Sequence, residues 1–222
     1  MRRTLSGAQL MNLKQDLMVL GDGWEECLGG IPKVGVMAIW GHSGNGKSSA
    51  AMSIAKECGK YSKVLYVAAE EGFGASIQNT ARRYDMGSLH TRFQCSIDTY
   101  DELMERLSKR ESPHTIIIDS PQALGLKKSQ FIEMRQKFGN SKLLIFVCQA
   151  DGKEPKGKTA QDIKFMADIK IWVSGFKAFS HGRFYGDTGE KIIWEEGAKR
   201  AYGRNKELTT NNDNNGDNGK EA

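Results

Sequence analysis

A glycine-rich segment near the start of the chain carries the residue types that bind phosphate groups. It runs from Gly41 to Ser48 and fits the pattern Gly-x-x-x-x-Gly-Lys-Ser/Thr. Glycines at these positions allow backbone angles that turn successive N–H groups toward one phosphate. The ammonium of Lys47 can reach the β- and γ-phosphates of a nucleotide, and the hydroxyl of Ser48 can bind Mg²⁺. We therefore predict a Mg-ATP site formed by Gly41, His42, Ser43, Gly44, Asn45, Gly46, Lys47, Ser48 and Ser49.

Acidic residues that follow apolar segments are expected to complete this site. Asp119 ends a run of three isoleucines and can hold Mg²⁺ through water, with a simple strand-capping aspartate as the alternative. Glu70 and Glu71 follow the mostly apolar segment 63–69, where a carboxylate can orient and deprotonate an attacking water. We predict that one of the two is this base and favour Glu70 over Glu71. The alternative is that both are solvated acids in a loop. Lys47 joins the catalytic candidates because it contacts the transferred phosphate.

Gln149 ends a third apolar segment, residues 143–148. Its amide can contact the γ-phosphate and pass the presence of that phosphate to the loop that follows. The alternative is an ordinary hydrogen bond at the end of a strand. We predict the sensor role for Gln149.

The segments that carry these residues alternate in character along the chain. Apolar stretches typical of buried strands are separated by helical stretches, which indicates an α/β fold with a mostly parallel sheet and helices on both faces. Right-handed crossovers then gather the carboxyl ends of the strands at the edge where ligands bind. We predict strands at residues 34–40, 63–69, 92–97, 115–119 and 143–148, and helices at residues 49–58, 75–84, 100–109 and 129–138.

The two ends of the chain differ from this alternating middle. The N-terminal end carries an amphipathic stretch at residues 10–20, which predicts a helix. Toward the C-terminus, three strand-like stretches joined by tight turns suggest antiparallel hairpins at one edge of the sheet, at residues 169–173, 177–184 and 191–194. The last residues are rich in Asn, Gly and Asp, which predicts a disordered tail. We divide the chain into an N-terminal helical extension (1–23), a core (24–205) and this tail (206–222).

Composition and charge limit the class of protein. The chain has 222 residues, of which 39% are hydrophobic and 27% are charged, as in a globular domain. No apolar run would form a membrane helix or a signal peptide, and the four cysteines are scattered, so we expect a cytoplasmic protein with neither disulfides nor zinc. The net charge is +5, and it becomes +7 for residues 1–205 because the tail carries −2. This charge fits either a mildly basic enzyme or attraction to phosphate polymers.

Taken together, these segments resemble the RecA-like ATPase family, especially the RadA/Sms branch and the DnaB-type helicase motor. The resemblance covers roughly residues 24–195. Its matching segments are the phosphate loop with its lead-in Leu28–Pro32, Tyr66–Glu71, Ile118–Gln122, Gln149 and Ser180–Phe184. It implies a P-loop ATP hydrolase with the RecA-like fold. An ATPase core without the additional domains of these larger proteins is typical of small recombination or annealing ATPases of phages and mobile elements.

The resemblance further implies that the chain assembles into a ring or a filament with the nucleotide between subunits. Arg183 is then a candidate to complete the site of a neighbouring subunit, and the alternative is a surface arginine on a hairpin. His181 occupies the position where the family has a lysine. Arg183 is therefore the residue of this segment that is certain to carry a positive charge.

Residues 151–160 are expected to form a loop rich in Lys and Gly, and a DNA-binding segment is expected directly after Gln149, at residues 150–158. Lys153, Lys156 and Lys158 lie on a backbone rich in glycine, which suits binding to a phosphate backbone without reading sequence. The loop contains no aromatic residue for stacking on bases, which weakens the case for single-stranded DNA. The alternative is a solvated connector.

These expectations combine into a Mg-dependent ATPase that assembles on single-stranded DNA in recombination, repair or replication, with a protein of those processes as a further candidate partner. The competing hypothesis is a regulatory or loader ATPase that remodels a protein partner and does not bind DNA. A small-molecule kinase fits less well, because Arg82 and Arg83 on a predicted helix are poor candidates for the lid arginines such an enzyme needs.

Overall fold

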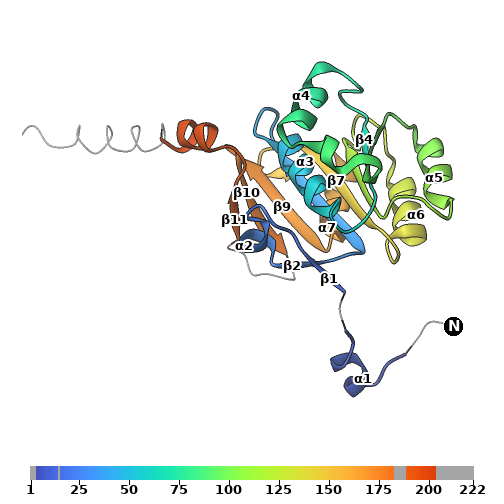
Figure 1. The fold of residues 1–222 in the computed structure, drawn as a ribbon. Coiled ribbons are helices and arrows are strands. Elements are labelled where there is room, and N and C mark those ends of the chain that lie inside the picture. Colours follow the sequence, from blue (N-terminus) through green and yellow to red (C-terminus); the bar gives the residue numbers. More distant parts are fainter. Residues whose placement is uncertain (1–3, 15, 183–188, 204–222) are drawn as a thin grey trace, which may run out of the picture.

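A central sheet dominates the part of the chain that the structure describes. This structure is a computed structural model, and it describes residues 4–14, 16–182 and 189–203 (Figure 1). The strands of this sheet are β3 (Gly35–Gly41), β4 (Val64–Ala68), β5 (Phe93–Ser96), β6 (Thr115–Asp119), β7 (Leu143–Asp151), β8 (Glu154–Pro155), β9 (Ile169–Ser174), β10 (Lys177–Gly182) and β11 (Glu190–Ile192). Their order across the sheet is β11-β10-β9-β3-β7-β6-β4-β5, and β8 pairs with β7 alone.

Pairing in the middle of the sheet is parallel. β3 pairs with β7 and β9, β6 pairs with β7 and β4, and β4 pairs with β5, all in the parallel sense. At the edge of the sheet formed by the C-terminal strands, β10 pairs antiparallel with β9 and with β11. The predicted α/β architecture, with antiparallel strands at the C-terminal edge, is therefore confirmed. The middle strands are buried along most of their length because both of their faces are covered.

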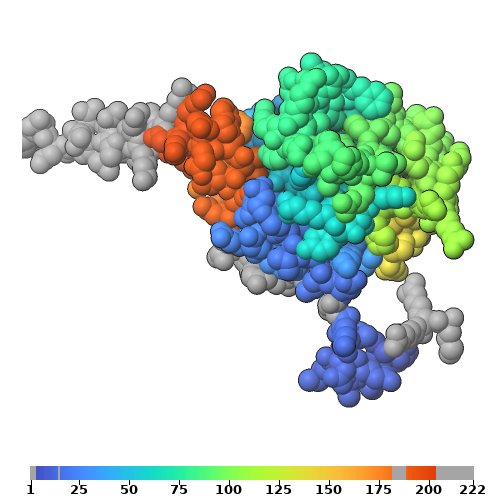
Figure 2. Space-filling view, viewed as in Figure 1, coloured from blue at the N-terminus to red at the C-terminus, as the bar shows by residue number. Residues whose placement is uncertain are grey.

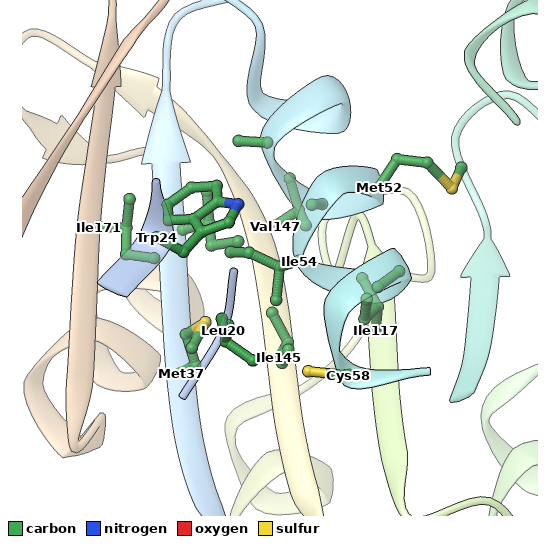
Figure 3. Close-up of a cluster of buried hydrophobic side chains, with 14 of the residues drawn as sticks. Leu20, Trp24, Met37, Met52, Ile54, Cys58, Ile117, Ile145, Val147 and Ile171 are labelled. Atoms are coloured by element: carbon green, nitrogen blue, oxygen red, sulfur yellow. The ribbon is translucent and has the colours of Figure 1, made fainter. Parts of the chain in front are cut away.

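Helices cover both faces of the sheet (Figure 1). One face carries α2 (Trp24–Leu28), α3 (Lys47–Cys58), α4 (Ala75–Arg83) and the 3-10 helix η1 (Met86–Arg92), and the other carries α5 (Tyr100–Ser108), α6 (Lys128–Phe138) and α7 (Lys158–Met166). Each face has its own cluster of buried hydrophobic side chains. Figure 3 shows part of the first cluster, in which Trp24, Ile54 and Ile171 meet between α3 and the strands. No helix of the described residues is long and apolar enough to cross a membrane.

The helix α3 packs against the sheet through small buried side chains and holds the preceding segment in place. Ala51 and Ala55 are fully buried, and their small side chains let the helix approach the strands closely. The hydroxyl of Ser53 accepts a hydrogen bond from Trp24 Nε1 at 2.8 Å and donates one to Asp22 Oδ2 at 3.0 Å. These bonds satisfy polar groups that burial would otherwise leave without partners, so the lead-in to the phosphate loop is fixed to its helix.

The prediction of a helix at residues 10–20 is wrong. The helix α1 covers only Gly7–Met11, and Leu17–Val19 form strand β1, which pairs antiparallel with β2 (Gly30–Pro32). Met18 is 1% exposed while the residues on either side of it are exposed, which is the alternation of a strand and not of a helix. This part of the chain therefore packs into the core. In contrast, α1 has no buried residue, and Figure 2 shows it standing away from the rest of the molecule.

The loop predicted at residues 151–160 is also wrong in part. Strand β7 runs beyond its predicted end, and the chain turns at Gly152, whose φ of 59° is favourable for glycine, to return as β8. The backbone N–H of Lys156 donates to the carbonyl of Gln149 at 2.7 Å, which holds this hairpin closed. The next helix, α7, already begins at Lys158. The segment is thus a short hairpin followed by a helix.

We predict that Met18→Ala lowers the free energy of unfolding by about 2–5 kcal/mol, because it removes a buried side chain from the core. The matched control is Val19→Ala, which alters a residue that is 56% exposed and should change this free energy by no more than about 0.5 kcal/mol. Urea denaturation of both variants measures the difference. Equal effects would contradict the strand assignment.

Candidate nucleotide-binding site

The predicted phosphate loop joins the end of β3 to the start of α3. A Cβ added at Gly41 would lie 2.1 Å from the carbonyl oxygen of Val173 in β9, so only glycine fits there. Gly46, with a φ of 95°, directly precedes α3 in the left-handed conformation that glycine adopts readily. The ammonium of Lys47 donates to the carbonyl of His42 at 2.9 Å across the loop. The loop therefore curls over the N-terminal end of α3, an arrangement suited to phosphate binding.

The register of the strands brings three predicted site residues together. Asp119 ends β6, opposite Ala68 of β4 on one side and Val147 of β7 on the other. Glu70 lies two residues after Ala68, and Gln149 lies two residues after Val147. Both therefore lie beyond the end of β6, where they meet. Gln149 Nε2 donates to Glu70 Oε1 at 3.1 Å, and the N–H of Glu70 donates to the carbonyl of Asp119 at 3.0 Å. The candidate base, which follows β4, and the candidate sensor on β7 are thus in direct contact.

Asp119 is a buried carboxylate, 7% exposed, beside the phosphate loop. Tyr66 Oη donates to its Oδ2 at 2.5 Å. Burial raises the pKa of Asp119, while hydrogen bonding by Tyr66 and by Ser48 acts in the opposite direction. The Ser48 hydroxyl and the Asp119 carboxylate therefore offer two oxygen donors at one place, and oxygen donors are what Mg²⁺ prefers. This donor set fits the predicted metal.

Lys47 lies in the field of the acidic residues. Burial lowers the pKa of its ammonium, and the carboxylates of Asp119 and Glu70 act to raise it. Electrostatic effects of this kind require the groups to be close, so the lysine, the metal-ligand candidate and the base candidate share one site. Each would act on a different part of a triphosphate.

Glu71 occupies a different position from Glu70. It lines a cavity of about 10 Å³ together with Ser48, Tyr66 and Asp119. A volume of this size is about the smallest that holds one water molecule. Both glutamates therefore border the site, and the hydrogen bond from Gln149 distinguishes Glu70.

An aromatic pocket beside the phosphate loop was not predicted from the sequence. It has a volume of about 440 Å³ and is lined by Ser49, Arg83, Phe176, Ile193 and Trp194. The rings of Phe176 and Trp194 meet edge to face with centroids 4.9 Å apart. Because the pocket opens at the first turn of α3, it offers a flat apolar surface for the base of a nucleotide whose phosphates lie in the loop.

Asn45 connects the phosphate loop to this pocket. Its side-chain Oδ1 accepts from the N–H of Gly175 at 2.7 Å, and its backbone carbonyl accepts from the N–H of Phe176 at 3.2 Å. The turn between β9 and β10 is therefore held against the loop. Spacing along the chain gives no signal for this contact, because the two segments are far apart in sequence.

The remaining predicted residues are Arg183 and the three lysines that follow Gln149. Arg183 falls outside the described residues. Lys153, Lys156 and Lys158 are exposed on the hairpin and at the start of α7, and not at the nucleotide site. The hairpin still contacts the site through Gln149, whose carbonyl accepts from Lys156.

Comparison with known proteins rests on structure alone. No protein-family model matches the chain, and no curated protein sequence matches it. The fold is similar to that of the KaiC-like protein PH0186 from Pyrococcus horikoshii, with a TM-score of 0.58 and 16% identity over 79% of this chain and 90% of that one. It is also similar to the flagellar accessory protein FlaH from Methanocaldococcus jannaschii, with a TM-score of 0.55 and 18% identity over 78% and 89% of the two chains. This chain has the RecA-like fold.

The RecA-like fold accounts for the layout of the site. One strand, β7, separates the phosphate-loop strand β3 from β6, which carries Asp119. Gln149 on β7 therefore stands between the phosphate loop and the acidic residues. The position of this amide follows from the strand order of the fold.

We predict that Trp194→Ala weakens ATP binding by about 1–3 kcal/mol, the range that stacking on an aromatic ring contributes for one base. Inorganic tripolyphosphate, which has no base, should bind the variant and the parent equally. Isothermal titration with both ligands measures this, with Trp194→Phe as the control that keeps a ring. Equal weakening for both ligands would contradict a base-binding role.

We predict that Tyr66→Phe raises the Mg²⁺ concentration needed for ATP binding by about 10- to 100-fold, because groups that orient a metal ligand affect metal affinity to this extent. Nucleotide binding measured in EDTA should not change. A Mg²⁺ titration with a fluorescent ATP analogue checks the result. An unchanged titration would mean that the bond from Tyr66 to Asp119 does not support the metal site.

Proposed function

We propose that this chain is a Mg-dependent ATPase of the RecA-like type that binds ATP between the subunits of a homo-oligomer. The observation that carries this proposal is the meeting of Lys47, Ser48, Glu70, Asp119 and Gln149 at the ends of neighbouring strands. Bound Mg²⁺ would neutralise negative charge that develops on the phosphate oxygens. Ser48 and Asp119 would hold the ion.

The chain's own residues then have distinct roles in hydrolysis. Lys47 binds the β- and γ-phosphates through its ammonium. Glu70 accepts a proton from the attacking water, and Gln149 fixes the orientation of this carboxylate through the 3.1 Å hydrogen bond. An arginine of a neighbouring subunit, for which we propose Arg183, stabilises the charge of the transferred phosphate.

Gln149 also gives a route from the nucleotide to the lysine hairpin. Its side chain contacts Glu70, and its backbone carbonyl holds the N–H of Lys156. If the amide turns toward the γ-phosphate, its hydrogen bond to Glu70 breaks, and a shift of the Gln149 backbone with it displaces the N–H of Lys156. A single residue thus couples the state of the nucleotide to the hairpin.

We propose single-stranded DNA as the substrate on which the ATPase acts, in recombination, repair or replication, as the resemblance to the RadA/Sms and DnaB-type branches suggests. The support is the net charge of +7 over residues 1–205 and the three exposed lysines beside Gln149. A strand of DNA bound there would contact the segment that Gln149 controls.

A second candidate is an ATPase that remodels a protein partner. Two observations favour it. The structural neighbours are named a KaiC-like protein and a flagellar accessory protein. In addition, Leu10 and Met11 of α1 are 62% and 87% exposed, as expected of apolar residues that bind another protein.

ATP turnover with and without single-stranded DNA separates the two candidates. We expect turnover to rise several-fold with DNA and DNA binding to fall steeply with salt. Alanine at Lys153, Lys156 and Lys158 together should remove the stimulation and leave turnover without DNA intact, whereas Lys47→Ala should abolish both.

Absence of DNA binding at low salt, with turnover intact, would favour the protein-remodelling ATPase. The mass in solution with a non-hydrolysable ATP analogue tests the oligomer. A monomer under these conditions would contradict a site shared between subunits.

A further inference from the structure

A groove runs along α7 beside the lysine hairpin. It has a volume of about 610 Å³, and its walls come from β8, α7 and β9. The side chains that line it include Lys158, Gln161, Asp162, Lys164, Phe165 and Lys170. It begins where the hairpin ends and extends along the helix, so it continues the surface that carries Lys153 and Lys156.

The charges of this groove leave it positive. Glu154, which also lines it, is paired with Lys164 at 2.7 Å, and Asp162 is paired with Lys128 at 3.0 Å. Among the described residues, Lys158 and Lys170 make no salt bridge. The acidic groups are therefore neutralised while two ammonium groups are available to an anionic ligand.

An exposed aromatic ring lies on the rim of the groove. Phe165 is 79% exposed, although Ile163 of the same helix is fully buried against the sheet. Two residues along a helix correspond to about 200°, so Phe165 points away from the core that Ile163 fills. Its ring does not stabilise that core and is free to stack on a ligand.

Aromatic side chains also link the groove to the phosphate loop. Lys164 lies 4.6 Å from the ring centre of Trp40, and Trp40 contacts Trp172 at a centroid distance of 5.8 Å. Trp172 in turn meets the ring of His42 edge-on at 5.9 Å. Because His42 belongs to the phosphate loop, a ligand in the groove is connected to the nucleotide site by side chains in direct contact.

We infer that this groove binds single-stranded DNA, with its phosphates on Lys158 and Lys170 and a base stacked on Phe165. This inference rests on the proposed action on DNA and supplies the aromatic surface that the lysine hairpin lacks. Lysines with an interspersed aromatic ring are typical of surfaces that bind single strands without reading sequence. A protein partner fits less well, because lysine is depleted in the centres of protein interfaces.

The salt dependence of DNA binding tests the inference. Fluorescence anisotropy with labelled oligo-dT and the full chain gives the affinity at several salt concentrations. Lys170→Ala should reduce the slope of log affinity against log salt by about 0.7, the value for one phosphate contact on a single strand. Phe165→Ala should weaken binding about tenfold at every salt concentration without changing the slope, and Phe165→Tyr should restore binding because it keeps the ring.

Controls on another part of the surface complete the experiment. Lys109→Ala and Ile97→Ala alter an exposed lysine and an exposed apolar side chain outside the groove, and neither should change affinity or slope. The thermal unfolding midpoint of Phe165→Ala should equal that of the parent, since the ring is exposed.

Three results would overturn the inference in different ways. If the parent binds DNA but the Phe165 and Lys170 variants bind like the parent, the groove is not the binding surface and the proposed function stands. If the parent binds no DNA at low salt, the proposed DNA function fails together with the groove. A loss of oligomer mass in Phe165→Ala, with DNA affinity unchanged, would instead assign the groove to contact between subunits.

Discussion

The site depends on the relative register of three parallel strands. Asp119 ends β6 and Ala68 ends β4 at the same level, while β7 continues beyond Val147 to Asp151. This leaves room beyond β6 in which Glu70 and Gln149 meet at 3.1 Å. A slip of one residue would turn every side chain of a strand to the opposite face, so the buried apolar residues of these strands fix the chemistry at their ends.

Much of the fold could be predicted because its signals are local. The apolar strands, the helices between them and the glycines of the phosphate loop each appear within a few consecutive residues. The prediction of a helix at residues 10–20 is wrong because Leu17–Val19 pair with Gly30–Pro32, and the local apolar pattern carries no signal of that pairing. The hairpin after Gln149 was missed for a related reason, since β8 has only two residues and depends on hydrogen bonds back to β7.

The predicted site residues have local signals in the sequence, whereas the site residues that sequence patterns do not reveal depend on contacts between distant segments. Lys47, Glu70 and Asp119 stand at the ends of recognisable strands or loops, and the structure places them together. Phe176 and Trp194 become neighbours only through the folding of the antiparallel edge, so no spacing rule identifies their pocket. The groove along α7 is likewise a product of packing between elements.

Asn45 joins the phosphate loop to the turn at Gly175 and Phe176 through both its side chain and its backbone. Each of these bonds restricts a segment that would otherwise sample many conformations. A phosphate-binding loop that is already rigid loses little conformational entropy when it takes up its ligand, so more of the interaction free energy appears as affinity. Through the same bonds, a displacement of the loop would be transmitted to the turn between β9 and β10 at the antiparallel edge.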